Sequence, residues 1–160
     1  MADSYTVQGT KSDIQITGPS TVVDVVVVSA TAQPSGVNFE YPVPAATYAT
    51  DGVDSSLQAP AWGVNYLAAS PNVSSVFYTQ QVDASGLLGG YMEVTVTIPT
   101  PPGLTGPFTL VVPIPMTAVA VAGARKNGSL QPYIDKAVAQ LEATAGVTTA
   151  APATTAAASG

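Results

Sequence analysis

The sequence predicts a mainly β protein: an antiparallel β-sandwich, immunoglobulin-like or jelly-roll-like, with one C-terminal amphipathic helix. Segments of alternating apolar and polar residues fill the first 112 positions, and Gly-, Pro- and Asn-rich turns separate them. The most strongly β-inclined segment is Thr21–Ser29 (TVVDVVVVS), whose valines are stiff at the first side-chain torsion and pack well on a pleated surface. A helical stripe of apolar residues is convincing only near the C-terminus.

The predicted elements follow in chain order. Residues 1–20 form either ordinary edge strands or an extended arm that lies on a neighbour, and residues 21–112 form the sandwich. Within the sandwich we expect strands at 21–29, 37–41, 62–67, 73–82, 91–98 and 108–112. Pro42 and Pro44 place the end of the second of these strands at a sheet edge. Residues 45–61 are predicted to be a surface loop, and 99–107 a rigid proline-rich one.

Residues 113–146 form an apolar segment followed by the predicted helix. The run 116–122 fits either a strand or a short helix. Ser129 is the predicted N-cap and Gly146 the C-terminal stop. One stripe of this helix carries Leu130, Ile134, Ala137, Val138 and Leu141. Residues 147–160 are a Thr/Ala/Ser tract that cannot form a core, and no sustained repeat is visible in the sequence.

Charge is scarce throughout the chain. Charged residues make up 9% of the sequence, whereas a soluble domain usually has about a quarter, so we expect surfaces that are permanently covered. The net charge is −6, and Lys11 is the only basic residue before Arg125. A nucleic-acid partner is therefore not expected, because phosphate binding needs a basic face.

Catalytic and metal-binding motifs are missing from the sequence. The chain has no Cys and no His, and its lysines form no serine–lysine motif. Asp51, Asp54 and Asp83 allow a calcium site or acid–base pair in principle, but Asp beside Gly in loops is mostly a turn former. We therefore predict no catalytic residue, no metal site and no cofactor.

Two kinds of targeting segment are also not expected. The N-terminal residues lack the basic flank and apolar run of a signal peptide, which predicts folding in a cytoplasm. Residues 93–125 carry no charge between their ends, but Pro113 and Pro115 interrupt them, and a spanning helix needs about 20 consecutive apolar residues. Membrane insertion is therefore not predicted.

Six residues are the candidates for subunit contacts. Asp24 interrupts the valine run, so it either reaches water at a rim or pairs with Lys11, Arg125 or Lys126 of a neighbouring subunit. The aromatic candidates are Trp62, Tyr66 and Tyr91, because aromatic side chains dominate interface energetics; their alternative is ordinary core packing. Arg125 and Lys126 complete the set.

The composition and architecture resemble a family of proteins. Abundant Ala, Val, Thr, Pro and Gly, absent Cys and His, an N-terminal arm and a low-complexity tail resemble small structural proteins of actinobacterial phage particles. The resemblance implies a tail or head protein of the virion, which acts through repeated contacts with other virion subunits, as a homo-oligomer or symmetric assembly, rather than through catalysis. The alternative is a host-surface or carbohydrate-binding module of sandwich type.

Overall fold

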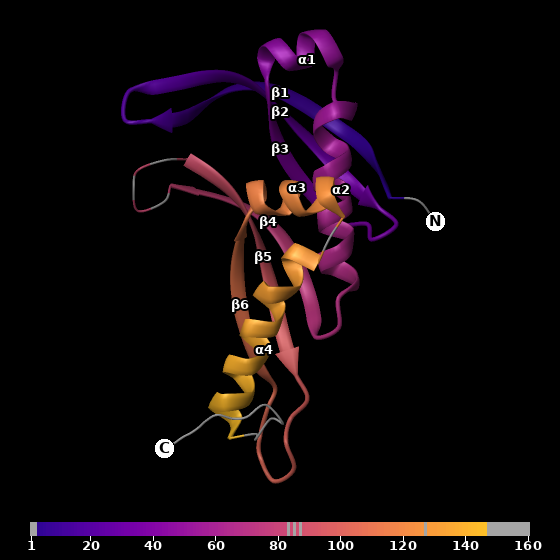
Figure 1. Cartoon of the computed structure of the whole chain (residues 1–160), viewed down its shortest axis with the longest axis vertical. Helices are drawn as coiled ribbons and strands as arrows, with labels where there is room; N and C mark the ends of the chain where they lie inside the picture. Colours follow the sequence, from indigo (N-terminus) through magenta and orange to yellow (C-terminus); the bar gives the residue numbers. More distant parts are fainter. Residues whose placement is uncertain (1–2, 83, 85, 87, 127, 147–160) are drawn as a thin grey trace.

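Two antiparallel three-stranded sheets, with helices packed beside them, make up the protein (Figure 1). The computed structural model describes residues 3–82, 84, 86, 88–126 and 128–146. The strands are β1 (Ser4–Gly18), β2 (Thr21–Gln33), β3 (Asn38–Pro44), β4 (Val73–Val82), β5 (Leu88–Ile98) and β6 (Phe108–Pro115). The helices are α1 (Ala45–Asp51), α2 (Asp54–Ala69), α3 (Met116–Arg125), the 3-10 helix η1 (Gly128–Leu130) and α4 (Gln131–Ala145).

The two sheets are copies of one unit, although the sequence shows no sustained repeat. Their strand orders are β1-β2-β3 and β4-β5-β6. Thr10 lies opposite Val28, and 66 residues later Val76 lies opposite Val94 (76 − 10 = 94 − 28 = 66). The register shift after Val7 recurs after Val73 at the same spacing. We call β1–α2 the first unit and β4–α4 the second.

Alternation along the central strand of each unit explains the shared architecture. Buried residues of β2 and β5 occupy matching positions: Val28, Ala30 and Ala32 in one strand, and Val94, Val96 and Ile98 in the other. Because successive strand residues point to opposite faces, each run buries one face of its sheet. The mainly β prediction is confirmed, as is the inward set Met92, Val94, Val96 and Ile98, whereas a face-to-face sandwich is not confirmed.

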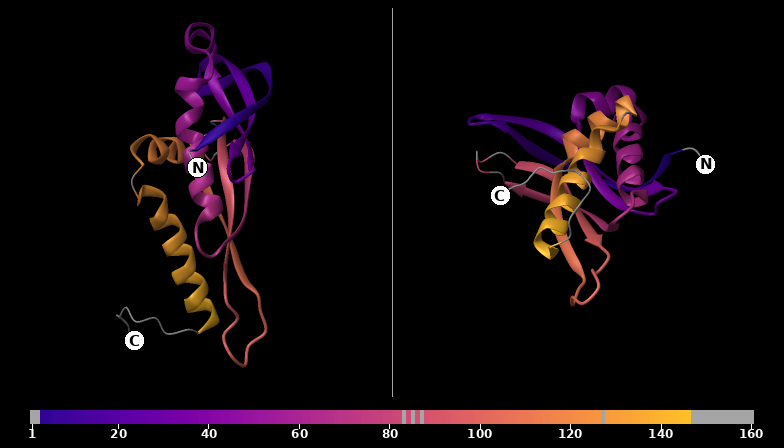
Figure 2. Two further views of the ribbon diagram at one scale, coloured as in Figure 1. Left: turned by 90° about the vertical axis from the view of Figure 1, so that its right-hand side faces the viewer. Right: turned by 60° about the horizontal axis from the view of Figure 1, so that its bottom comes forward.

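The predicted number of helices is wrong, because α1, α2 and α3 precede α4. Helices α2, α3 and α4 lie on one side of the sheets (Figure 2). Residues 45–61, predicted as a loop, form α1 and the start of α2, and residues 62–67, predicted as a strand, continue α2. Leu57, Ala61, Val64 and Leu67 are fully buried on one helical stripe, and this burial outweighs the cost of Pro60 inside the helix.

The C-terminal helix follows its prediction more closely. Helix α4 buries Ile134, Ala137 and Leu141, with Leu130 buried just before it, and it ends at Gly146, whose positive φ of 78° suits the left-handed cap. The 3-10 turn η1 holds Ser129, so Leu130 and not Ser129 is the N-cap. The run 116–122 is helical, as part of α3. The predicted tail, 147–160, lies outside the described residues.

The valine strand is divided between a core and a projection. Val25, Val27 and Val28 are buried, whereas all four residues from Thr21 to Asp24 are exposed. This exposed end pairs with β1 and forms a hairpin that projects from the body (Figure 1). We call this projecting hairpin, residues 11–24, the arm; it overlaps the predicted arm of residues 1–20 but is not the same segment. The hairpin of β4 and β5 projects toward the same side.

The two units are joined where α2 crosses α3 at close range. A Cβ atom at Gly123 would lie 1.8 Å from the Ala59 carbonyl oxygen, and one at Gly63 would lie 2.5 Å from a Val119 methyl carbon. Such distances are far inside van der Waals contact, so the crossing requires glycine at both positions.

Replacing Gly123 with alanine tests this packing. Alanine favours a helix over glycine by up to about 1 kcal/mol, but the contact with backbone atoms of α2 cannot relax cheaply. We expect Gly123→Ala to lower the free energy of unfolding by about 3 kcal/mol, measured by denaturant titration. The control is Gly128→Ala, which has open space around it and should change stability little. Equal stability of the two variants would contradict the close crossing.

Candidate functional site

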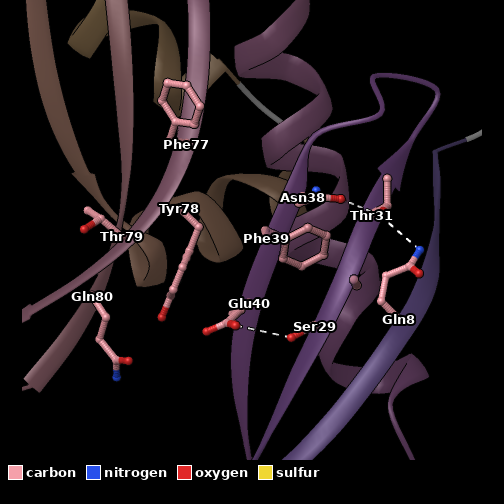
Figure 3. A pocket seen from close by; sticks show the side chains of 11 residues that line it. Gln8, Ser29, Thr31, Asn38, Phe39, Glu40, Phe77, Tyr78, Thr79 and Gln80 are labelled. Atoms are coloured by element: carbon pink, nitrogen blue, oxygen red, sulfur yellow. Dashed lines mark hydrogen bonds between the residues drawn. The ribbon is translucent and has the colours of Figure 1, made fainter.

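A hollow lies where β2 and β3 of the first unit face β4 of the second (Figure 3). Its volume is about 860 Å³, within the range of small-molecule sites. Amide, hydroxyl and aromatic side chains line it, with one carboxylate: Gln8, Ser29, Thr31, Asn38, Phe39, Glu40, Phe77, Tyr78, Thr79 and Gln80. The groove is open, and its lining is a mixture of polar and apolar surface.

Hydrogen bonds between neighbouring strands hold the first-unit wall of the groove. Gln8 Nε2 donates to Thr31 Oγ1 at 3.2 Å, and Thr31 Oγ1 donates to Asn38 Oδ1 at 2.6 Å (Figure 3). Ser29 Oγ donates to the Glu40 carboxylate at 3.3 Å. These side chains alternate with the buried residues of β2 and β3, so the strand period itself places them in one polar row.

Tyr78 forms the opposite wall. Burial, and to a lesser extent the nearby charge of Glu40, raises its pKa to about 12. Its ring lies over Gly90 of β5, where a Cβ atom would come 2.7 Å from the phenol oxygen. A phenol with this pKa stays protonated at neutral pH, so Tyr78 acts as a hydrogen-bond donor or acceptor and not as a base.

Phe77 gives the groove an exposed apolar surface, with 63% of its side chain accessible. Together with the amides it can bind a neutral, hydroxyl-rich ligand through stacking and hydrogen bonds. The described residues contain no group of three or more His, Cys, Asp or Glu side chains placed to hold a metal ion.

Two of the predicted contact residues stack inside the chain. The rings of Trp62 and Tyr66 lie 5.3 Å apart on α2, with an interplanar angle of 21°. The Tyr66 hydroxyl donates to the Gln131 side chain, which ties α2 to α4. Both residues are half-buried, so they contribute to packing between the helices.

The other four candidates are spread over the surface. Asp24 is exposed on the arm, and Tyr91 is half-buried on β5. Arg125 and Lys126 are exposed at the end of α3, where Lys126 lines a small hollow with Trp62 and Asp54. The structure therefore brings Trp62 into contact with Tyr66 and into one hollow with Lys126, the neighbour of Arg125 in the chain, and the role of all six in subunit contacts stays a prediction.

Sequence reasoning missed the groove. Glu40 and Phe77 come from different units, and only the fold places β3 beside β4. The available signal was the alternation in β4, which puts Phe77 on the face opposite the buried Val76.

The arm is the second candidate surface. Ile14 is 51% exposed and lies opposite Asp24; Val22, two residues from Asp24 and on the same face as Ile14, is 58% exposed, and Val23, on the other face, is 36% exposed. The Tyr5 hydroxyl near the base of β1 donates to the Asp54 carboxylate and so anchors β1 to α2. Beyond that base, every side chain from Thr6 to Ile14 is exposed.

No protein-family model, curated protein or solved structure matches the chain. Among the described residues, no helix is both long enough and apolar enough to span a membrane.

The pKa of Tyr78 gives a test of the groove. Because its folded-state pKa lies above the usual 10.0, Tyr78 contributes stability below pH 10 that is lost as the pH rises toward about 12. We expect spectrophotometric titration of Tyr78→Phe to lose one phenol that ionises near pH 12. Glu40→Gln should lower that pKa but leave it above 10.0, since burial is the larger cause. A Tyr78 that ionises at its ordinary pKa would contradict this geometry.

Proposed function

We propose that this chain is a non-enzymatic structural protein of a phage particle, a tail or capsid-associated component located in the virion and acting through repeated subunit contacts. The observation that carries the proposal is the arm. It projects from the body and leaves Ile14, Val22 and Val23 accessible on a hairpin with no helix over it (Figure 1). Apolar side chains gathered on a projecting element are typical of surfaces that a partner covers.

The charge distribution supports the same proposal. In a chain with 9% charged residues, electrostatic repulsion between copies is weak, and surface charge is what usually keeps a protein soluble and unassociated. The groove also fits a role without catalysis. Its one carboxylate, Glu40, accepts a hydrogen bond from Ser29 Oγ at 3.3 Å and lies near the Tyr78 phenol, and no Lys, Arg or His is among the lining residues.

The groove favours one alternative, a host-surface or carbohydrate-binding module. Exposed Phe77 beside Gln8, Asn38 and Gln80 matches the aromatic and amide contacts that a neutral sugar needs. The two functions differ in what they require of the free chain, since assembly requires self-association and sugar binding does not.

The mass of the purified chain in solution, measured by light scattering over a range of concentrations, tests the proposal. We expect oligomers, and about tenfold weaker association for the double variant Ile14→Thr, Val22→Thr, which keeps β-branched side chains but removes apolar surface from the arm. The matched control is Val111→Thr on β6, which is 54% exposed and distant from the arm in sequence.

A stable monomer at every concentration would contradict assembly. If that monomer binds neutral oligosaccharides and Phe77→Ala abolishes the binding, the carbohydrate-binding alternative is the correct one.

A further inference from the structure

Strand β1 has a long outer edge that pairs with no other strand in the described chain. It is the outermost strand of its sheet, 15 residues long, and bonded to β2 along one side only. Unpaired strand edges are templates for pairing with another chain, and proteins usually blunt them with prolines or by covering them. Strand β1 contains no proline and is not covered along the arm.

The edges of the other outer strands are protected from pairing with another chain. The edge strands β3 and β6 are short, and each carries two prolines near its end, at 42 and 44 and at 113 and 115. Strand β4, the counterpart of β1 in the second unit, lies against β3 of the first unit. Strand β1 is therefore the outer strand with the longest unprotected edge.

The sequence of this edge is self-complementary. The register with β2 is regular between the irregularities at Val7/Gly9 and Ile16/Gly18, and Ser12 lies near the middle of that stretch. If two β1 strands pair antiparallel with Ser12 opposite Ser12, Lys11 of each copy lies opposite Asp13 of the other. Opposite charges directly across an antiparallel pair are stabilising, and a twofold axis makes each such contact twice.

Charge also selects this register over its neighbours. Centring the pair on Lys11 would put two ammonium groups opposite each other, and centring it on Asp13 would do the same with two carboxylates. A lone lysine on an edge opposes pairing, but a carboxylate two residues further on the same face turns it into a recognition element. In the second unit the equivalent positions hold Phe77 and Thr79, so the charge pair is confined to the free edge.

We propose that β1 pairs antiparallel with β1 of a second copy of this chain, about a twofold axis at Ser12, to form a six-stranded sheet across the two first units. The inference deepens the proposed assembly function and rests on it. Within one chain the Ile14 N–H donates to Asp13 Oδ1 at 2.8 Å. Pairing gives outward backbone groups of β1 a strand partner and gives Ile14 a neighbour, Thr10 of the other copy, on the same face.

Charge exchange tests the register. We expect Lys11→Asp and Asp13→Lys each to weaken dimerisation about tenfold, because each puts like charges opposite each other in two places. The double variant Lys11→Asp, Asp13→Lys should restore the wild-type dissociation constant in sedimentation equilibrium. Both side chains are exposed, and the hydrogen bond from the Ile14 N–H that Asp13→Lys removes is itself exposed, so the circular dichroism of the folded monomer should change little. A double variant as weak as the single ones, or single variants without effect, would overturn the pairing.

A single cysteine tests the axis independently, because the chain contains no Cys. Ser12→Cys should form a covalent dimer on mild oxidation, since the two thiols lie opposite each other. Thr10→Cys is the matched control. Its two copies would be offset by four residues along the strands, about 13 Å, and out of disulfide reach. Equal cross-linking of both variants, or none of Ser12→Cys, would overturn the axis at Ser12. If β6 of one copy instead docks on β1 of the next, head to tail, Ser12→Cys should form no covalent dimer.

Failure of the inference and failure of the proposed function give different results. A wild-type chain that is monomeric throughout contradicts both. A wild-type oligomer that is insensitive to the charge exchange and to Ser12→Cys leaves assembly standing and overturns the β1 pairing alone.

Discussion

The close crossing of α2 and α3 is the contact on which the rest of the structure depends. Each unit is a three-stranded meander with one apolar face, and such a sheet is not stable unless a second layer covers that face. Gly63 and Gly123 let the two helices approach until their backbones nearly touch, so one core runs through both units. The groove between β3 and β4 follows from this junction, because the crossing sets the two sheets beside each other (Figure 3).

The first strand of each unit occupies the same place in its sheet, but β4 packs against β3 of the other unit whereas the outer edge of β1 is free in the described chain. In the second unit, β4 lies against β3, and Val76 is buried. In the first unit the equivalent residue of β1, Thr10, is exposed, and the strand carries Lys11 and Asp13 on its free edge. The same backbone register thus serves packing within the chain at one end and, in our proposal, recognition of a second chain at the other.

Much of this fold was predictable from local patterns. The strands with strict alternation and the helical stripe with its Gly146 stop appear where their periods place them. Helix α2 was missed because Pro60 and Gly63 disfavour a helix and because Trp62, Val64 and Tyr66 also fit a strand period; only burial against α3 and the sheets decides between them. The repeat was hidden because it conserves register rather than side chains, as Ser12 and Tyr78 show. Trp62 and Tyr66, predicted as contact anchors, stack within the chain.

Hydrogen exchange of β1 in dilute and in concentrated protein tests the central claim, that this edge is built to be covered by a second copy. Strand β4 has the same fold and register and serves as the internal reference. The account predicts that amides between Gly9 and Gln15 exchange more slowly as concentration rises, while those of β4 keep their rates. Exchange in β1 that is equally fast at every concentration would contradict it.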